Sequence, residues 1–186
     1  MRNATNFVIV MGVSGSGKTE VARCLAASAH GTWLDADDYH PIENVEHMRR
    51  GLPLNDEMRW PWLDAVCKAA LKTQNDTKDF KKGGTTAPVN RAITFIACSA
   101  LKRRYRDFLR QFLTPELLFL FLDGPRDLIL ERMNSRTGHF MPSALLDSQL
   151  ADLEPLDPDE NAITVSIEGP LDGIVRQAEE LLNINS

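Results

Sequence analysis

Cysteine is scarce in this chain, and long apolar runs are absent from it. The 186 residues include three cysteines, an odd number without C-x-x-C spacing, which predicts free thiols in a reducing compartment. No apolar stretch reaches the length that spans a membrane, and residues 1–6 are too short and polar for a signal peptide. We therefore expect a cytoplasmic protein without a membrane partner.

An excess of positive charge is absent as well. The formal net charge is −5, whereas nucleic acids and anionic membrane surfaces favour proteins with a basic face. A small anionic substrate is compatible with this charge, because it requires only a local cluster of Arg and Lys. The apolar content of 43% and the charged content of 25% are typical of globular proteins. We expect residues 1–186 to form a single domain with no nucleic-acid partner.

A glycine-rich segment follows directly on the apolar run at residues 7–11 and matches G-x-x-x-x-G-K-[ST]. Glycines let successive backbone N–H groups approach a phosphate, and the following helix directs its positive end at the same anion. Lys18 is expected to reach the β- and γ-phosphates as a catalytic residue, and the Thr19 hydroxyl is expected to bind Mg²⁺. The predicted ATP-binding residues are Gly12, Val13, Ser14, Gly15, Ser16, Gly17, Lys18 and Thr19.

Apolar runs of strand length alternate with segments of helical period along the chain. The runs at residues 7–11, 32–34, 92–98, 117–122 and 163–167 predict five strands. This alternation predicts an α/β fold in which a parallel sheet carries helices on both faces, with the active site at the carboxyl ends of the strands. Residues 72–90 show neither period and contain Gly and Pro, so we expect an exposed loop insertion there.

Several carboxylates follow the predicted strands. Asp35 and Asp37 come after the second strand, where an extended backbone would direct both side chains to the same side. A kinase that acts on an alcohol needs one carboxylate to deprotonate the hydroxyl and another on the Mg²⁺ side. We assign these roles to Asp37 and Asp35, and we interpret Asp38 as a solvated cap of the next helix. Asp123 also ends a strand, but Gly124-Pro125 follows it, so a helix N-cap is the preferred interpretation.

Basic residues gather where an anionic substrate and the transferred phosphoryl group would lie. Closing arginines over the phosphates would neutralise charge in the transition state and exclude water. A segment with Gly and Pro at residues 137–142 fits a hinged lid, which we place at residues 133–142. His40 and His139 are expected to hydrogen-bond substrate hydroxyls, because no Cys/His spacing supports zinc. The basic candidates are Arg59, Lys102, Arg106, Arg132 and Arg136.

The order of the motifs closely resembles the gluconokinase family, small phosphate-loop kinases related to shikimate and nucleoside-monophosphate kinases. The resemblance covers nearly the whole chain and is far more specific than the phosphate loop alone. The segments that support it are GVSGSGKT (12–19), DADDYHP (35–41), PLND (53–56), RWPWL (59–63), CSALK (98–102), YRD (105–107), GHFMP (138–142), SQ (148–149) and LEP (153–155).

The resemblance implies a phosphate-loop kinase fold with a mobile lid. It also implies transfer of the γ-phosphoryl group of ATP to the 6-hydroxyl of D-gluconate, with Mg²⁺ as cofactor. By position, Asp37 is similar to the carboxylate that contacts the acceptor hydroxyl, and Asp35 to its neighbour on the Mg²⁺ side. A homodimer is also suggested by the resemblance. The implied substrate contacts are Asp37, His40, Arg59, Lys102, Arg106 and His139, and the implied lid arginines are Arg132 and Arg136.

Two alternatives stay open at this point. The first is a kinase of another small acid, most plausibly shikimate, although the third strand is followed by Cys98-Ser99-Ala100-Leu101-Lys102 rather than by a Gly-Gly-Gly turn. The second is a nucleotide-dependent switch without an acceptor, which the carboxylates and the basic cluster disfavour. A panel of acceptors in an ADP-release assay would distinguish the three.

Overall fold

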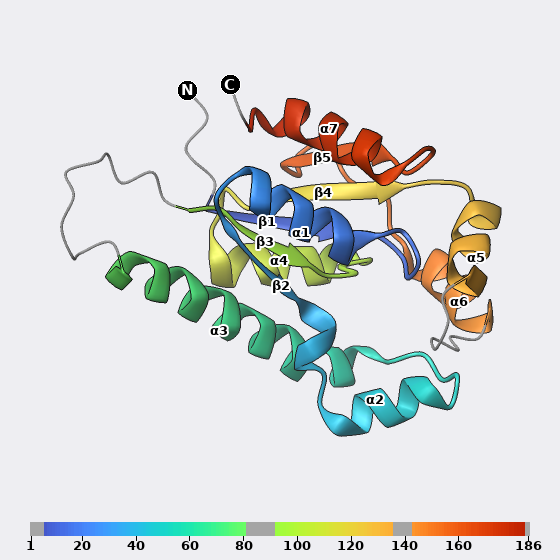
Figure 1. Ribbon diagram of the computed structural model, residues 1–186. Helices are drawn as coiled ribbons and strands as arrows, with labels where there is room; N and C mark the ends of the chain where they lie inside the picture. Colours follow the sequence, from blue (N-terminus) through green and yellow to red (C-terminus); the bar gives the residue numbers. More distant parts are fainter. Residues whose placement is uncertain (1–5, 81–91, 136–142, 185–186) are drawn as a thin grey trace.

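The sheet is the central element of the protein (Figure 1). The computed structural model describes residues 6–80, 92–135 and 143–184. In this part of the chain the five strands are all parallel and lie in the order β2-β3-β1-β4-β5. The predicted α/β fold with a five-stranded parallel sheet is confirmed. The strands are β1 (Phe7–Met11), β2 (Thr32–Asp35), β3 (Thr94–Ala97), β4 (Leu118–Asp123) and β5 (Ala162–Ser166).

Helices cover both faces of this sheet, as predicted. On one face lie α1 (Lys18–Ser28) and α7 (Leu171–Leu182), and on the other lie α3 (Asp56–Phe80) and α4 (Arg103–Leu113). Successive side chains of a strand point to opposite faces, so β1 contributes to two cores. Val8 and Val10 pack with the α1 and α7 side, whereas Phe7, Ile9 and Met11 pack with the α3 and α4 side.

The remaining helices lie beyond the carboxyl ends of the strands. In Figure 1, α5 (Arg126–Ser135) and α6 (Ser143–Asp152) lie at the end of the sheet toward which the strand arrows point. A short 3₁₀ helix at Ala36–Tyr39 and α2 (Ile42–Arg49) follow the end of β2. These connections therefore surround the edge at which the active site was predicted. Of the predicted lid, residues 133–135 belong to α5, and residues 136–142 lie outside the described part.

The third helix is longer than predicted. It begins at Asp56, where the side chain of Asn55 accepts a hydrogen bond from the Met58 amide at 2.9 Å and so caps the first turn. It then continues through Phe80, so the prediction of a loop over residues 72–90 is wrong for residues 72–80. Gln74 is buried and its amide donates to the Asn6 carbonyl at 3.4 Å, which supplies a packing contact that sequence period did not reveal. Residues 81–91 lie outside the described part.

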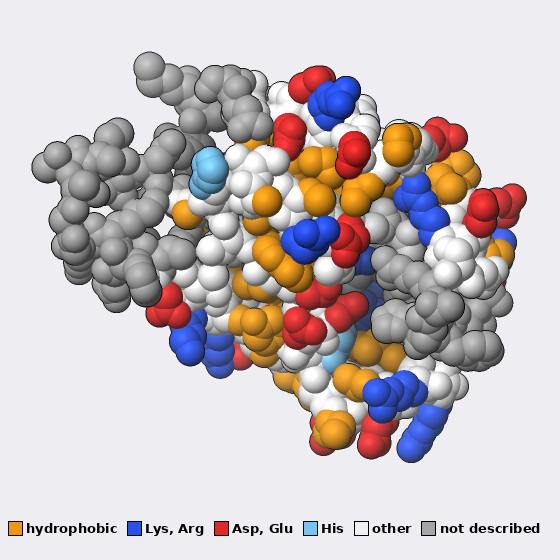
Figure 2. Space-filling model, in the orientation of Figure 1, with side chains coloured by type: hydrophobic (Ala, Val, Ile, Leu, Met, Phe, Trp, Pro, Cys, Tyr) orange, Lys and Arg blue, Asp and Glu red, His pale blue; other side chains and the backbone are white. Residues whose placement is uncertain are grey.

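None of the helices in the described ranges has the length and apolar character needed to cross a membrane. The three cysteines are free thiols, as predicted. On the face drawn in Figure 2, Lys and Arg side chains are interspersed with Asp and Glu side chains.

Candidate active site

The phosphate loop between β1 and α1 has a backbone that requires glycine. Gly12 and Gly15 have φ angles of +147° and +85°. A Cβ on Gly15 would lie 2.6 Å from Cγ of Met133, which shows how closely α5 packs on the loop. Gly17 caps α1 with a φ of +94° and makes no side-chain cap hydrogen bond. Because Gly17 has no side chain that could cap the first amides of α1, these amides are available to phosphate oxygens.

Two side chains at the start of α1 bind within the loop region. Nζ of Lys18 donates to the Val13 carbonyl at 3.0 Å, so the ammonium group lies over the loop. The Thr19 hydroxyl donates to Oδ2 of Asp35 at 2.6 Å. This contact joins the phosphate loop to the end of β2. It also places beside each other two oxygen atoms of the type that Mg²⁺ prefers, on the two residues expected to bind the ion.

The acidic segment after β2 is not extended. It forms the 3₁₀ helix, with Asp35 as its N-cap: Oδ1 of Asp35 accepts a hydrogen bond from the Asp37 amide at 3.0 Å. The geometric reason given for a shared direction of the two carboxylates is therefore wrong. The two residues are joined by capping instead, because the Asp35 carboxylate accepts from Thr19 and from the backbone amide of Asp37, while the Asp37 side chain is 75% exposed. Asp38 lies inside this 3₁₀ helix, and the N-cap of α2 is Pro41 rather than Asp38.

His40 lies next to the candidate base. Its Nε2 is 3.7 Å from Oδ1 of Asp37, and its ring stacks on Trp62 at a centroid distance of 4.3 Å. On the other side, Nδ2 of Asn44 is 3.5 Å from Nδ1 of His40 and also donates to the Met58 carbonyl at 2.9 Å. Asn44 was missed by the sequence analysis, which had no signal for a buried amide on α2.

Burial is the main reason why His40 is neutral. It lowers the pKa of His40 from 6.5 to about 4, and the positive charge of Arg59 lowers this pKa further, against the opposing effect of Asp35. An Asn44 amide that donates to Nδ1 favours the tautomer with the proton on Nε2. Nε2 would then donate toward Asp37. The arrangement favours a neutral His40, and its hydrogen bond to a substrate hydroxyl stays a prediction.

Two of the predicted basic residues come together near one carboxylate. Arg59, on α3, donates from Nε to the Leu54 carbonyl at 3.2 Å, and its guanidinium carbon is 5.3 Å from the ring centroid of Tyr105. Lys102 is the N-cap of α4 with an extended backbone, so it does not share a helix face with Arg106 as predicted. Both cations approach the carboxylate of Asp152, which the sequence analysis missed.

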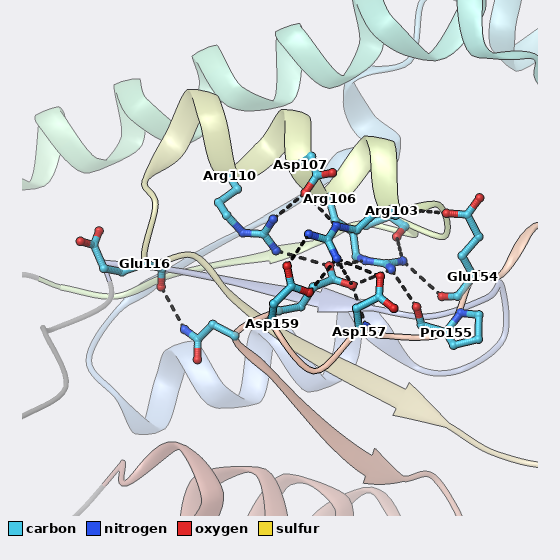
Figure 3. A network of polar contacts seen from close by, with 12 residues as sticks. Arg103, Arg106, Asp107, Arg110, Glu116, Glu154, Pro155, Asp157 and Asp159 are labelled. Atoms are coloured by element: carbon cyan, nitrogen blue, oxygen red, sulfur yellow. Dashed lines mark hydrogen bonds and ion pairs between the residues drawn. The ribbon is translucent and has the colours of Figure 1, made fainter.

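Arg106 is placed elsewhere. Its side chain is fully buried and forms a bidentate ion pair with Glu160, with Nε–Oε1 and Nη2–Oε2 distances of 2.7 and 2.8 Å. The guanidinium also donates to the carbonyls of Leu101, at 3.0 Å, and Pro155, at 3.1 Å. Figure 3 shows this network, in which Arg103 and Arg110 surround the pair. With its donors bonded inside the protein, Arg106 is not brought to the substrate, contrary to the prediction; only burial could have revealed this.

The lid arginines are only partly described. Nη2 of Arg132 donates to the carbonyls of Ile167 at 2.7 Å and Gly169 at 3.2 Å, which joins α5 to the segment after β5. Arg136 and His139 lie outside the described residues. Asp123 is the last residue of β4, and α5 begins at Arg126, so Asp123 does not occupy the predicted N-cap position.

Gln149 is a further residue of the site that was not predicted. Its Oε1 accepts a hydrogen bond from the Ser14 amide at 2.6 Å, across 135 positions of sequence. Helix α6 therefore binds the phosphate loop directly. The motif SQ in the sequence marked this place, but no local pattern indicated the contact.

Comparison with known proteins identifies similar kinases. The thermoresistant gluconokinase of Escherichia coli is 39% identical over 175 residues, covering 94% of this chain and 91% of that protein. The gluconokinase of Gluconobacter oxydans is 42% identical over 171 residues, covering 92% and 88%. The chain belongs to the gluconokinase family.

Solved structures and family models complete the comparison. The crystal structure of a gluconokinase from Sinorhizobium meliloti has a TM-score of 0.79 and 38% identity, and the match covers 98% of this chain and 94% of that one. No family model matches the sequence. The resemblance drawn from the motifs is confirmed. As a member of the gluconokinase family, the chain is an ATP-dependent kinase.

Proposed function

We propose that the protein is a gluconokinase that transfers the γ-phosphoryl group of ATP to the 6-hydroxyl of D-gluconate, giving 6-phospho-D-gluconate and ADP. The observation that supports this most directly is the hydrogen-bonded chain from Thr19 through Asp35 to the amide of Asp37. The Asp35 carboxylate lies next to the phosphate loop, and its second oxygen binds the backbone of Asp37, the residue whose carboxylate is proposed to contact the acceptor hydroxyl for in-line transfer. Family membership supplies gluconate as the acceptor.

The residues divide between donor and acceptor. The loop amides and Lys18 bind the triphosphate and offset its charge as the bond between the γ-phosphorus and ADP breaks. Asp37 accepts the proton of the 6-hydroxyl while the oxygen bonds to phosphorus. Arg59 and Lys102 bind the carboxylate of gluconate, and His40 donates to Asp37 or to a substrate hydroxyl. Arg132, Arg136 and His139 are proposed to complete the lid side.

The residues present fit a Mg²⁺ ion. The Thr19 hydroxyl and the Asp35 carboxylate are oxygen donors that lie 2.6 Å apart, and within the described ranges no cluster of three or more His, Cys, Asp or Glu side chains competes as a metal site. Mg²⁺ retains water and phosphate ligands readily, so two protein oxygens suffice. When bound, the ion would neutralise charge on the β- and γ-phosphates. We further propose a single kinase domain over residues 1–186; a homodimer and a cytoplasmic location stay predictions.

The test is an ADP-release assay with ATP, Mg²⁺ and a panel of acceptors. The panel contains D-gluconate, other sugar acids, shikimate and nucleoside monophosphates, with a reaction without acceptor as control. We expect gluconate to be the only acceptor of the panel that is phosphorylated rapidly. Nuclear magnetic resonance of the product should show the phosphoryl group on the 6-hydroxyl. Preference for shikimate, or slow hydrolysis that no acceptor stimulates, would refute the proposal.

A further inference from the structure

The carboxylate of Asp152 lies between two cations that come from different helices. Its Oδ1 is 2.9 Å from Nζ of Lys102, and its Oδ2 is 3.6 Å from Nη2 of Arg59. Each oxygen thus faces one cation. This is the arrangement that the carboxylate of a bound sugar acid would adopt between the same two groups.

The two cations need a counter-ion in the absence of substrate. The side chain of Arg59 is 9% exposed and that of Lys102 is 21% exposed, so water solvates both poorly. Two like charges in such surroundings repel each other unless an anion lies between them. Asp152, itself 27% exposed, supplies that anion and can still reach water if it moves away.

Arg59 does not depend on Asp152 for its position. Its Nε is bonded to the Leu54 carbonyl, and its guanidinium lies against the ring of Tyr105. These contacts hold the guanidinium whether or not the carboxylate is present. A role for Asp152 as the residue that orients Arg59 is therefore disfavoured, and a role as an exchangeable counter-ion is favoured.

The position of Asp152 at the end of its helix favours displacement of the carboxylate. Asp152 is the last residue of α6, and the partial negative charge at the C-terminal end of a helix disfavours a carboxylate there. One turn earlier, Gln149 of the same helix accepts the Ser14 amide of the phosphate loop. Helix α6 therefore contacts the donor site and the acceptor cations at once.

We propose that Asp152 is an internal counter-ion that competes with the substrate carboxylate for Arg59 and Lys102, and thereby sets the affinity of the site for its acid substrate. The proposal rests on the gluconokinase activity proposed above. Gluconate replaces Asp152 between the two cations, and the displaced carboxylate moves toward solvent. Asp152 thus weakens the binding of the acid while it stabilises the empty site.

The test compares wild-type protein with Asp152→Asn, which keeps the shape of the side chain and removes its charge. The matched control is Asp147→Asn on the same helix, where an exposed carboxylate pairs with Arg126 at 2.8 Å. We expect Asp152→Asn to lower KM for gluconate by roughly 5- to 100-fold, equivalent to about 1–3 kcal/mol, because the substrate no longer has to displace a carboxylate from the two cations. The kcat value and the KM for ATP should not change, and the control should match wild type.

A second measurement needs no turnover. In thermal unfolding, Asp152→Asn should melt below wild type without added anion, and acetate or gluconate should stabilise it at lower concentration than wild type. An unchanged or raised KM, or an anion response equal to that of wild type, would overturn the proposal. If wild type does not phosphorylate gluconate, the proposed function fails, and the acetate series still decides the role of Asp152.

Discussion

Replacing Arg106 by Met should unfold the protein far more than it should impair the binding of substrate. The change leaves the buried carboxylate of Glu160 without its bidentate partner and removes the donors of four backbone carbonyls. Removal of one partner from a buried ion pair costs about 3–5 kcal/mol. Since a domain of this kind is stable by about 5–15 kcal/mol, we expect roughly a fifth or more of the free energy of unfolding to be lost.

The direction of the pKa shift of Glu160 agrees with a destabilising effect. Burial alone would raise the pKa of this carboxyl, but the hydrogen bonds from Arg106 and from the Asp157 amide, with the charge of Arg106, hold it below its ordinary value. The carboxylate is thus ionised while fully buried. Without Arg106, its cationic partners among the described residues are Arg110, at 3.3 Å, and the more distant Arg103, at 3.8 Å. A buried charge that has lost its main partner is the most expensive outcome of such a substitution.

Urea denaturation followed by circular dichroism measures the loss, with Arg104→Met as matched control. Arg104 lies on the same helix, is 53% exposed and pairs with Asp56, so its replacement should cost at most about 1 kcal/mol. The double replacement of Arg106 and Glu160 by Met should recover part of the loss, because no buried charge then remains. If Arg106→Met costs less than about 1 kcal/mol yet raises KM for gluconate about tenfold, Arg106 binds substrate and the structural reasoning is refuted.

Three further predictions concern the site itself. Asp37→Asn should lower kcat at least ~10²-fold with nearly unchanged KM for ATP in steady-state assays, the scale for losing a general base, and near-normal turnover would exclude that role. Because the pKa of His40 is lowered to about 4 in the folded protein, its contribution of about 3 kcal/mol to the free energy of unfolding is complete above pH 6.5 and is lost as the pH falls toward 4. Urea denaturation across this range should therefore show a shallower pH dependence of stability for His40→Gln than for wild type. Identical slopes would contradict the lowered pKa of His40. Gly15→Ala should raise KM for ATP about tenfold or more, since a Cβ meets Met133 at a positive φ, whereas Gly173→Ala, with only ordinary contacts, serves as the control and should not change it; equal values for the two variants would refute the loop geometry.

Local patterns were sufficient where the determinant lies within a few residues of sequence. The phosphate loop depends on glycines and a lysine at set spacing, and buried strands need unbroken apolar runs, so both could be predicted. The bounds of α3 could not be predicted, because its last turns lie in a polar stretch whose helical state depends on contacts such as that of Gln74 with the carbonyl of Asn6. Most of the stability of a helix in a protein comes from tertiary packing, so the propensity of its residues does not define where the helix ends.

The sequence by itself determined the chemical inventory of the protein: a phosphate loop after a buried strand, two carboxylates after β2, and enough Arg and Lys to bind an acid. The tertiary structure alone decided which of the Arg and Lys side chains lie together and which are buried in ion pairs. Arg59 and Lys102 both lie near Asp152, whereas Arg106 forms a buried ion pair with Glu160, 54 residues away in sequence. The physical reason is that a charged side chain can be assigned only when its partners and its burial are known, and both arise from segments that the fold, not the local sequence, brings together.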